Sequence, residues 1–180
     1  KQTFKVRDYT LTAYQKYIEI ILENYNDILR FDEYFRLNKP LKSFVIFRHD
    51  VDRHPNRALK MANLESQLGI KSTYYFRMKN HTFIPNIILK ISEMDHEIGY
   101  HYECLSDADG DLEKALVDFK INLDRLRKIV PVNTISMHGR PLSKYDNRYM
   151  WGSIKNKKIL KNELKLLGEV YLDIDYSDIA

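Results

Sequence analysis

The chain contains the stretch Phe44-Val45-Ile46-Phe47-Arg48-His49-Asp50-Val51-Asp52, in which a short apolar run breaks into an imidazole and two carboxylates. A short apolar run of this kind is typical of a buried strand. In α/β folds, catalytic and ligand-binding groups collect where the strands end. Three side chains that can bind a metal or a proton therefore mark this strand end as the candidate active site.

The length of 180 residues allows one substantial core, and we expect a single domain over residues 1–180. Hydrophobic residues make up 44% and charged residues 30%, a balance typical of a globular chain rather than a disordered one. The net charge of +4 is mild. The lysine run between residues 155 and 161 is interpreted as a solvated helix face, so no nucleic-acid partner is expected.

Cellular location is weakly constrained by the sequence. The single cysteine, Cys104, excludes an internal disulfide framework and a thiolate zinc cluster. No apolar run approaches the ~20 residues that a membrane span needs, and no signal peptide is visible. These features slightly favour a cytoplasmic protein, while the oligomeric state and the exact compartment stay open. The chain does not begin with Met, so whether the native protein continues beyond either end also stays open.

Hydrophobic periodicity predicts helices that alternate with strands. We expect helices at residues 10–30, 56–68, 86–94, 112–130 and 157–167, and strands at 44–47, 72–76, 97–101, 133–137 and 170–174. Strands and helices in alternation pair the strands in parallel through right-handed crossovers. The sequence therefore predicts an α/β fold, namely a distorted or incomplete (β/α) barrel of parallel strands. An open flavodoxin-like sheet is the rival architecture.

Polar side chains follow three of the predicted strands. They are the His49–Asp52 group, His101 with Glu103, and His138 with Arg140. Because parallel strands bring their carboxyl ends to one side, these groups are expected to converge. One carboxylate and two imidazoles suit Zn²⁺ and also other divalent metals. The remaining carboxylate is then free to act as a base toward a water whose pKa the metal lowers to about 7.

Several of these segments resemble the polysaccharide deacetylase (NodB-type) family. The resemblance is carried by Phe47-Arg48-His49-Asp50-Val51-Asp52, Glu97-Ile98-Gly99-Tyr100-His101 and Gly139-Arg140-Pro141, and by residues 69–76, which resemble the family's second strand. The first segment resembles in particular those members whose acidic motif reads His-Asp-Val-Asp. The resemblance covers residues 44–141. It implies a distorted (β/α) barrel and a metal-dependent hydrolase that removes N-acetyl groups from a carbohydrate.

The resemblance also implies roles for single residues. Asp50 matches the catalytic base, and Arg140 resembles the arginine that orients this base. Asp52 stands nearest the metal-binding aspartate, although Val51 separates it from Asp50. His101 matches the first histidine of the metal motif. The implied cofactor is a divalent metal, with zinc favoured, and the implied partner is a carbohydrate or another N-acetylated substrate.

One position departs from the family pattern. The second histidine of the metal motif would fall at Leu105, and His138 at the end of the next strand is the candidate replacement ligand. The family's late histidine, a general acid, has no match. Two alternatives therefore stay open. One is a catalytically inactive carbohydrate-binding module on the same scaffold, and the other is a hydrolase of a different small amide C–N bond.

The other polar and aromatic side chains receive simpler interpretations. Arg48 is a second candidate partner for a carboxylate, and His49 is given no firm role. Glu103 and Cys104 are interpreted as structural residues. The loop aromatics either stack on a sugar ring or fold back on the core, and three further histidines are expected at the surface. The loop aromatics are Tyr145, Tyr149 and Trp151, and the expected surface histidines are His54, His81 and His96.

Overall fold

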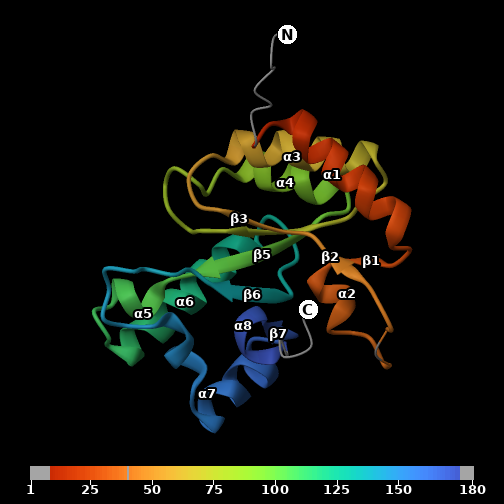
Figure 1. Ribbon diagram of the computed structural model, residues 1–180. Helices are drawn as coiled ribbons and strands as arrows, with labels where there is room; N and C mark the ends of the chain where they lie inside the picture. Colours follow the sequence, from red (N-terminus) through yellow and green to blue (C-terminus); the bar gives the residue numbers. More distant parts are fainter. Residues whose placement is uncertain (1–8, 40, 175–180) are drawn as a thin grey trace.

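The computed structural model describes residues 9–39 and 41–174 and has a mixed α/β architecture built on parallel strands (Figure 1). The larger sheet contains, in this order, β3 (Arg48–Val51), β4 (Thr73–Phe76), β5 (Glu97–Tyr102), β6 (Thr134–Met137) and β7 (Gly168–Glu169). Every neighbouring pair in it is parallel. A second, two-stranded parallel sheet joins β1 (Ile28–Leu29) to β2 (Val45–Ile46). The predicted α/β class with parallel strands is confirmed.

The described strands of the larger sheet follow one another in chain order. This order lacks the reversal that defines a flavodoxin-like sheet. Within the described residues, no hydrogen-bonded pairing closes β7 onto β3, so the sheet is open at both edges. The helical segments are α1 (Leu11–Asn24), α2 (Phe31–Tyr34), α3 (Pro55–Gln67), α4 (Pro85–Glu93), α5 (Cys104–Asp107), α6 (Leu112–Arg127), η1 (Asn147–Trp151), α7 (Ile154–Lys158), η2 (Ile159–Glu163) and α8 (Val170–Asp173).

Local signals in the sequence set the ends of several helices. The Thr10 side chain accepts a hydrogen bond from the Ala13 amide and so caps α1. Pro55 occupies the first turn of α3, where its missing N–H costs no hydrogen bond. Gly69 follows α3 with a φ of +75°, a conformation that glycine adopts without strain. The predicted helix at 56–68 is confirmed to within one residue at each end.

The alternation of side chains along the strands separates two faces of the sheet. On one face, the apolar side chains of β3–β6 pack with α3, α4 and α6 in the main hydrophobic core. On the other face, Tyr75 of β4 packs against Phe31 of α2 and Val170 of α8. In Figure 1, α3 and α4 accordingly lie above the strands, and α2 and α8 lie below them. Both faces of the sheet are therefore covered.

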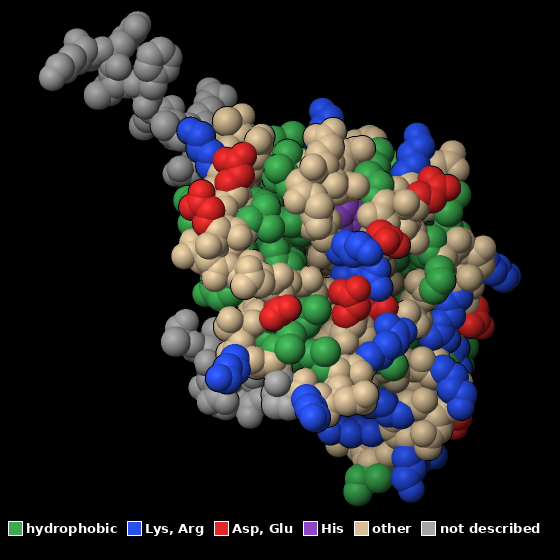
Figure 2. Space-filling model, turned by 90° about the vertical axis from the view of Figure 1, so that its right-hand side faces the viewer, with side chains coloured by type: hydrophobic (Ala, Val, Ile, Leu, Met, Phe, Trp, Pro, Cys, Tyr) green, Lys and Arg blue, Asp and Glu red, His purple; other side chains and the backbone are tan. Residues whose placement is uncertain are grey.

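The surface at the amino ends of the strands carries charges of both signs. Figure 2 shows acidic and basic side chains interspersed on this side of the molecule, with basic ones gathered in its lower half. Lys71 and Asp95 form an exposed ion pair of 2.7 Å here, and the Arg30 guanidinium donates to the Asp95 carbonyl. Mixed charges of this kind fit the interpretation that the basic residues are solvated.

Of two predicted elements near the C-terminus, one is wrong and the other has different bounds. The predicted strand at 170–174 is a helix, α8, and the strand of this region is the shorter β7. The cause is Glu169, whose carboxylate accepts hydrogen bonds from the Tyr171 amide of α8 and from the Met137 amide of β6. This cap turns the chain out of the sheet into a helix. The predicted lysine-rich helix at 157–167 is present but lies nearer the N-terminus, as α7 followed by the π-helical turn η2, which ends at Glu163.

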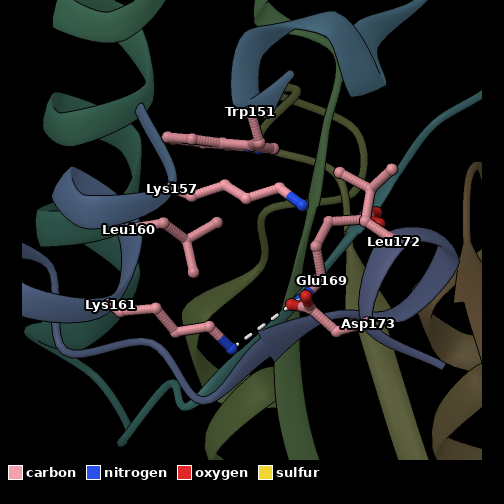
Figure 3. Close-up of a pocket in the computed structure, with 7 residues that line it drawn as sticks. All are labelled: Trp151, Lys157, Leu160, Lys161, Glu169, Leu172 and Asp173. Atoms are coloured by element: carbon pink, nitrogen blue, oxygen red, sulfur yellow. Dashed lines mark hydrogen bonds and ion pairs between the residues drawn. The ribbon is translucent and has the colours of Figure 1, made fainter. Parts of the chain in front are cut away.

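A small crevice lies between this C-terminal segment and α7 (Figure 3). Trp151, Leu160 and Leu172 supply its apolar wall, while Lys161 and Asp173 pair across it at 3.3 Å. Its volume of about 20 Å³ accommodates roughly one water molecule. The crevice is therefore a packing gap beside the buried Trp151, and a substrate needs another site.

Glu97 is a buried carboxyl at the start of β5. It accepts hydrogen bonds from the hydroxyls of Thr73 and Thr134, at 2.8 and 2.6 Å, and from the Asp32 amide at 3.0 Å. Burial and the neighbouring Asp32 carboxylate nevertheless raise the pKa of Glu97 to about 7. The folded protein therefore holds this proton more tightly than the unfolded chain does. Its stabilising effect is complete below about pH 4.5 and is lost as the pH rises through about 7.

We therefore expect Glu97→Gln to flatten the pH dependence of stability. The free energy of unfolding of the wild type, relative to the variant, should fall by up to about 3 kcal/mol between about pH 4.5 and 8. Urea unfolding monitored by the fluorescence of the buried Trp151, the single tryptophan of the chain, measures this difference. Glu93→Gln, the same change at an exposed position of α4, is the control. A difference that stays constant with pH would contradict the raised pKa.

Candidate functional site

The pleat of β3 sends the residues of the opening motif to opposite faces of the sheet. The strand runs through Arg48–Val51, so His49 and Asp50 lie within it and Asp52 follows it directly, which corrects the predicted strand end at Phe47. The His49 side chain points toward the helices, where its Nε2 lies 2.6 Å from Glu65 Oε1. Asp50 and Asp52 point to the other face. The motif therefore serves two different sites.

The site of His49 is a buried hydrogen-bonded cluster. Glu65 of α3 is fully buried and accepts hydrogen bonds from the hydroxyls of Tyr14 at 2.5 Å and Tyr74 at 2.7 Å. Burial alone would raise the pKa of Glu65, but His49 and the two tyrosines together hold it below its usual value. The cluster satisfies a buried charge and fastens α1 and α3 to the sheet. His49 is therefore a structural residue.

The three proposed metal ligands converge at the carboxyl ends of β3, β5 and β6. His138 Nδ1 lies 3.2 Å from His101 Nε2, and Asp52 Oδ1 lies 3.3 Å from His138 Nδ1 and 3.5 Å from His101 Nε2. The parallel pairing of β5 with β6 brings the two histidines together, because it sets Tyr102 beside Met137. We call Asp52, His101 and His138 the triad.

The dimensions of the triad fit a tetrahedral metal. With metal–ligand distances of ~2.0–2.2 Å, such a site separates its ligand atoms by ~3.3–3.6 Å, and the three measured distances fall at or within 0.1 Å of this range. Asp52 Oδ1 is also shielded from solvent without a hydrogen bond of acceptable geometry. A buried polar atom without a partner is costly, and a cation at the triad would satisfy it.

The protonation of the triad also suits a cation. His101 is 3% exposed, and its Nδ1 lies 2.9 Å from the Ser136 carbonyl, which can only accept. Nδ1 therefore carries the hydrogen, and the Nε2 lone pair faces the other two ligands, a support that metal-binding histidines commonly have. Burial lowers the pKa of His101 and keeps the ring neutral. Burial acts to raise the pKa of Asp52, but the opposing effects of His138, His101 and Arg77 are together larger and hold this pKa below its usual value. The carboxylate is therefore ionised.

Asp50 lies beside the triad and is held by Arg48 from its own strand. Arg48 donates from Nε to Asp50 Oδ1 at 3.0 Å and from Nη2 to Oδ2 at 2.7 Å, a two-point contact that fixes the carboxylate plane. Arg48 Nη2 also donates to the Ser136 hydroxyl, and its guanidinium stacks 4.8 Å from the Tyr171 ring centroid. Asp50 Oδ2 lies 3.7 Å from His101 Nε2. A fixed carboxylate thus adjoins the triad.

The expected contact between Arg140 and Asp50 is replaced by the one from Arg48. Arg140 donates to Asp107 Oδ1 at 2.8 Å, and its Nε lies 3.9 Å from Glu103. The physical reason is the loop after β6, which carries Arg140 toward α5, whereas Arg48 lies two residues from Asp50 on the same face of β3. The role of orienting Asp50 therefore passes to Arg48.

The remaining candidates divide between core and surface. Leu105, at the position of the missing motif histidine, is 5% exposed and packs in the main core. Trp151 is fully buried, while Tyr149 is 71% exposed and Tyr145 is half-buried. His96 is buried and accepts from the Ser72 amide, so its predicted surface position is wrong. The surface positions predicted for His54 and His81 are confirmed.

Sequence reasoning missed a charged pair beside the triad. Arg77 follows β4 directly, and Glu103 follows β5; they form a two-point ion pair with distances of 2.7–2.9 Å. Glu103 is 4% exposed, so its interpretation as a structural residue fits this pairing. Arg77 could have been identified from the sequence, because it stands at the carboxyl end of a predicted parallel strand, like Asp52, His101 and His138.

Comparison with family models, with curated proteins and with solved structures finds no match to this chain. The geometry of the site therefore carries the functional argument. The helices within residues 9–39 and 41–174 are all too short or too polar to cross a bilayer.

Proposed function

We propose that the protein is a metal-dependent hydrolase that removes N-acetyl groups from a carbohydrate. The observation that carries this proposal is the triad: one carboxylate and two imidazoles at tetrahedral spacing, with the fixed carboxylate of Asp50 beside them. Three protein ligands of the His and carboxylate type are usual in catalytic zinc sites, whereas structural sites have four. Zinc is the favoured cation on this ligand set.

Asp52, His101 and His138 would hold the cation. A divalent cation at such a site supplies Lewis acidity, which polarises an amide carbonyl and lowers the pKa of water to about 7. The neutral His101 ring and the ionised Asp52 offer their lone pairs without first losing a proton. The Ser136 carbonyl fixes the direction in which His101 offers its lone pair.

Asp50 is the base in this proposal. It accepts the proton of the water that attacks the acetamide carbon, and it later returns a proton to the departing amine. Arg48 holds both carboxylate oxygens, which limits rotation of the group and keeps Oδ2 near the triad. Arg48 is a positioning residue, since its contacts run to Asp50, Ser136 and Tyr171.

We also propose that the fold is an incomplete barrel of the polysaccharide deacetylase type. Two observations support it. The strands follow chain order without reversal, and β2 and β3 lie on one continuous run, in which the Phe47 carbonyl accepts from the Thr73 amide and links the two sheets. Residues at the carboxyl ends of the strands then supply the site, as in barrels generally.

A catalytically inactive carbohydrate-binding module is the second candidate. It is favoured by the absence, among the described residues, of a second histidine placed as the family's general acid: His49 and His96 lie on the opposite face, and the remaining imidazoles outside the triad are at the surface. The buried Leu105 also leaves the family's second metal position without a ligand. A hydrolase of another small amide uses the same base and ligands, and differs only in its substrate.

The test of this proposal combines metal analysis with substrate turnover. We expect the purified protein to contain about one equivalent of zinc or a similar divalent metal, and to release acetate from N-acetylated sugar oligomers until a chelator removes the metal. Acetate released only from small amides that are not sugars would assign the other hydrolase. Sugar binding that survives chelation, without acetate release, would assign the binding module.

A further inference from the structure

A cleft lined by charged side chains adjoins the triad. His138, a member of the triad, forms part of its wall, and Arg77, Lys79, Glu103, Asp107 and Arg140 supply its charges. These residues come from the carboxyl ends of β4, β5 and β6 and from α5. The cleft is open to solvent and has a volume of about 290 Å³, near the lower end of the ~300–1,000 Å³ of small-molecule sites.

Arg77 forms the fixed wall of this cleft. Its Nε and Nη2 are bound to Glu103, a carboxylate that is 4% exposed, and the Arg77 side chain is itself 16% exposed. No hydrogen bond from Arg77 Nη1 is found in the described part of the chain. A planar guanidinium held on one edge keeps donors free on another, which suits two-point recognition of an oxyanion.

Lys79 and Arg140 form the accessible wall. Both donate to Asp107, at 2.7 and 2.8 Å, and both remain partly exposed, at 34% and 41%. They also approach Glu103, at 3.3 and 3.9 Å. The lining of the cleft thus holds three cations and two carboxylates, so it has one positive charge in excess although each cation contacts a carboxylate. Asp107 holds the two accessible cations in place, and it also competes with any anion that approaches them.

We propose that this cleft binds an anionic group of the substrate, a carboxylate or a phosphate, while the bond to be hydrolysed lies at the triad. His138 borders both the cleft and the triad, so an anion in the cleft lies close to the proposed reaction site. The assignment of this anion to the substrate rests on the proposed function. Anion binding in the cleft itself depends on the charged side chains of the cleft and needs no metal at the triad. Selection of a charged carbohydrate follows, since only an anionic one neutralises the excess positive charge of the cleft.

The arrangement of charges leads us to expect two opposite effects of mutation on anion affinity. Arg140→Gln and Lys79→Gln each remove a donor and a charge, and we expect each to weaken anion binding about fivefold. Asp107→Asn removes the competing carboxylate, and we expect it to tighten anion binding about threefold. A network that serves only stability predicts no gain for Asp107→Asn, because that change breaks two ion pairs. A folding defect cannot produce tighter binding.

The experiment measures binding by nuclear magnetic resonance titration, in the presence of a chelator and at low ionic strength. The probes are glucuronate and glucose 6-phosphate, each compared with glucose. Arg148→Gln is the matched control, because Arg148 is an exposed cation of the following segment that lies outside the cleft and pairs with Asp146. We expect either anionic probe to bind more tightly than glucose, with shifts at the amides of the cleft, and raised salt to weaken it.

The two anionic probes identify the source of the charge, since preference for one assigns a carboxylate or a phosphate. The proposal is overturned if neither binds more tightly than glucose, or if Arg148→Gln weakens binding as much as Arg140→Gln. Because the chelator removes any metal, a failure of the hydrolase proposal leaves this binding result intact, and the reverse also holds.

Discussion

Asp50→Asn is expected to lower the rate of acetate release by about a thousandfold, within the ~10²–10⁴ range of general acid–base catalysis. Asparagine has nearly the same shape as aspartate, so the change removes a proton acceptor while it leaves the strand in place. Arg48 loses its ionic partner, but its contacts with Ser136 and with the Tyr171 ring remain. Zinc affinity should change much less than the rate, because Asp50 is outside the triad.

Two measurements separate this expectation from a general loss of structure. Acetate release and zinc binding are compared in the same preparation, and Asp118→Asn, the same change on the exposed side of α6, serves as the control. A rate for Asp50→Asn within tenfold of the wild type would remove Asp50 as the base. An equal loss of rate in Asp118→Asn would point to the fold instead of the site.

His101→Ala is expected to weaken zinc binding about a hundredfold or somewhat more. Zinc sites with four ligands have apparent binding free energies of ~10–16 kcal/mol, so one ligand accounts for ~2.5–4 kcal/mol. His138→Ala should have a similar effect, because the two imidazoles lie on the same triangle of donor atoms. This second variant tests whether His138 replaces the motif histidine whose position Leu105 occupies.

Competition with a chromophoric chelator measures both affinities, and thermal unfolding shows whether each variant is folded. His54→Ala is the control, because His54 is an exposed imidazole two residues beyond Asp52 and outside the triad. If the wild type and His138→Ala bind zinc equally, His138 is not a ligand. If none of the proteins binds zinc or a similar divalent metal, the hydrolase proposal fails, while the charged cleft is tested separately.

Much of the site could be predicted from the order of elements. Alternating strands and helices imply parallel strands, and parallel strands place their carboxyl ends at one edge of a sheet. Asp52, His101 and His138 each stand at or just beyond such an end, so their convergence followed from local patterns. The split of the motif between two faces also follows from the period of a strand, provided that the strand is known to continue through His49 and Asp50.

Contacts between charged residues could not be predicted in this way. Arg48 and Arg140 are both arginines at a strand end of the predicted site, and only the path of the loop after β6 assigns Arg140 to Asp107. The polar side chain of His96 suggested a surface position, yet the fold buries it between the Ser72 amide and the Ala62 carbonyl. Such pairings depend on distances between elements that are far apart along the chain.

The sequence by itself determined the α/β class, the alternation of α3, β4, α4, β5, α6 and β6, and the three strand ends that carry the triad. Hydrophobic periodicity is a local property, and it determines which face of an element is buried. The tertiary structure decided the partner of Asp50, the structural role of His49, and the charged cleft beside His138. Each of these requires the relative placement of elements, since polar side chains form bonds only over a few ångströms and in defined directions.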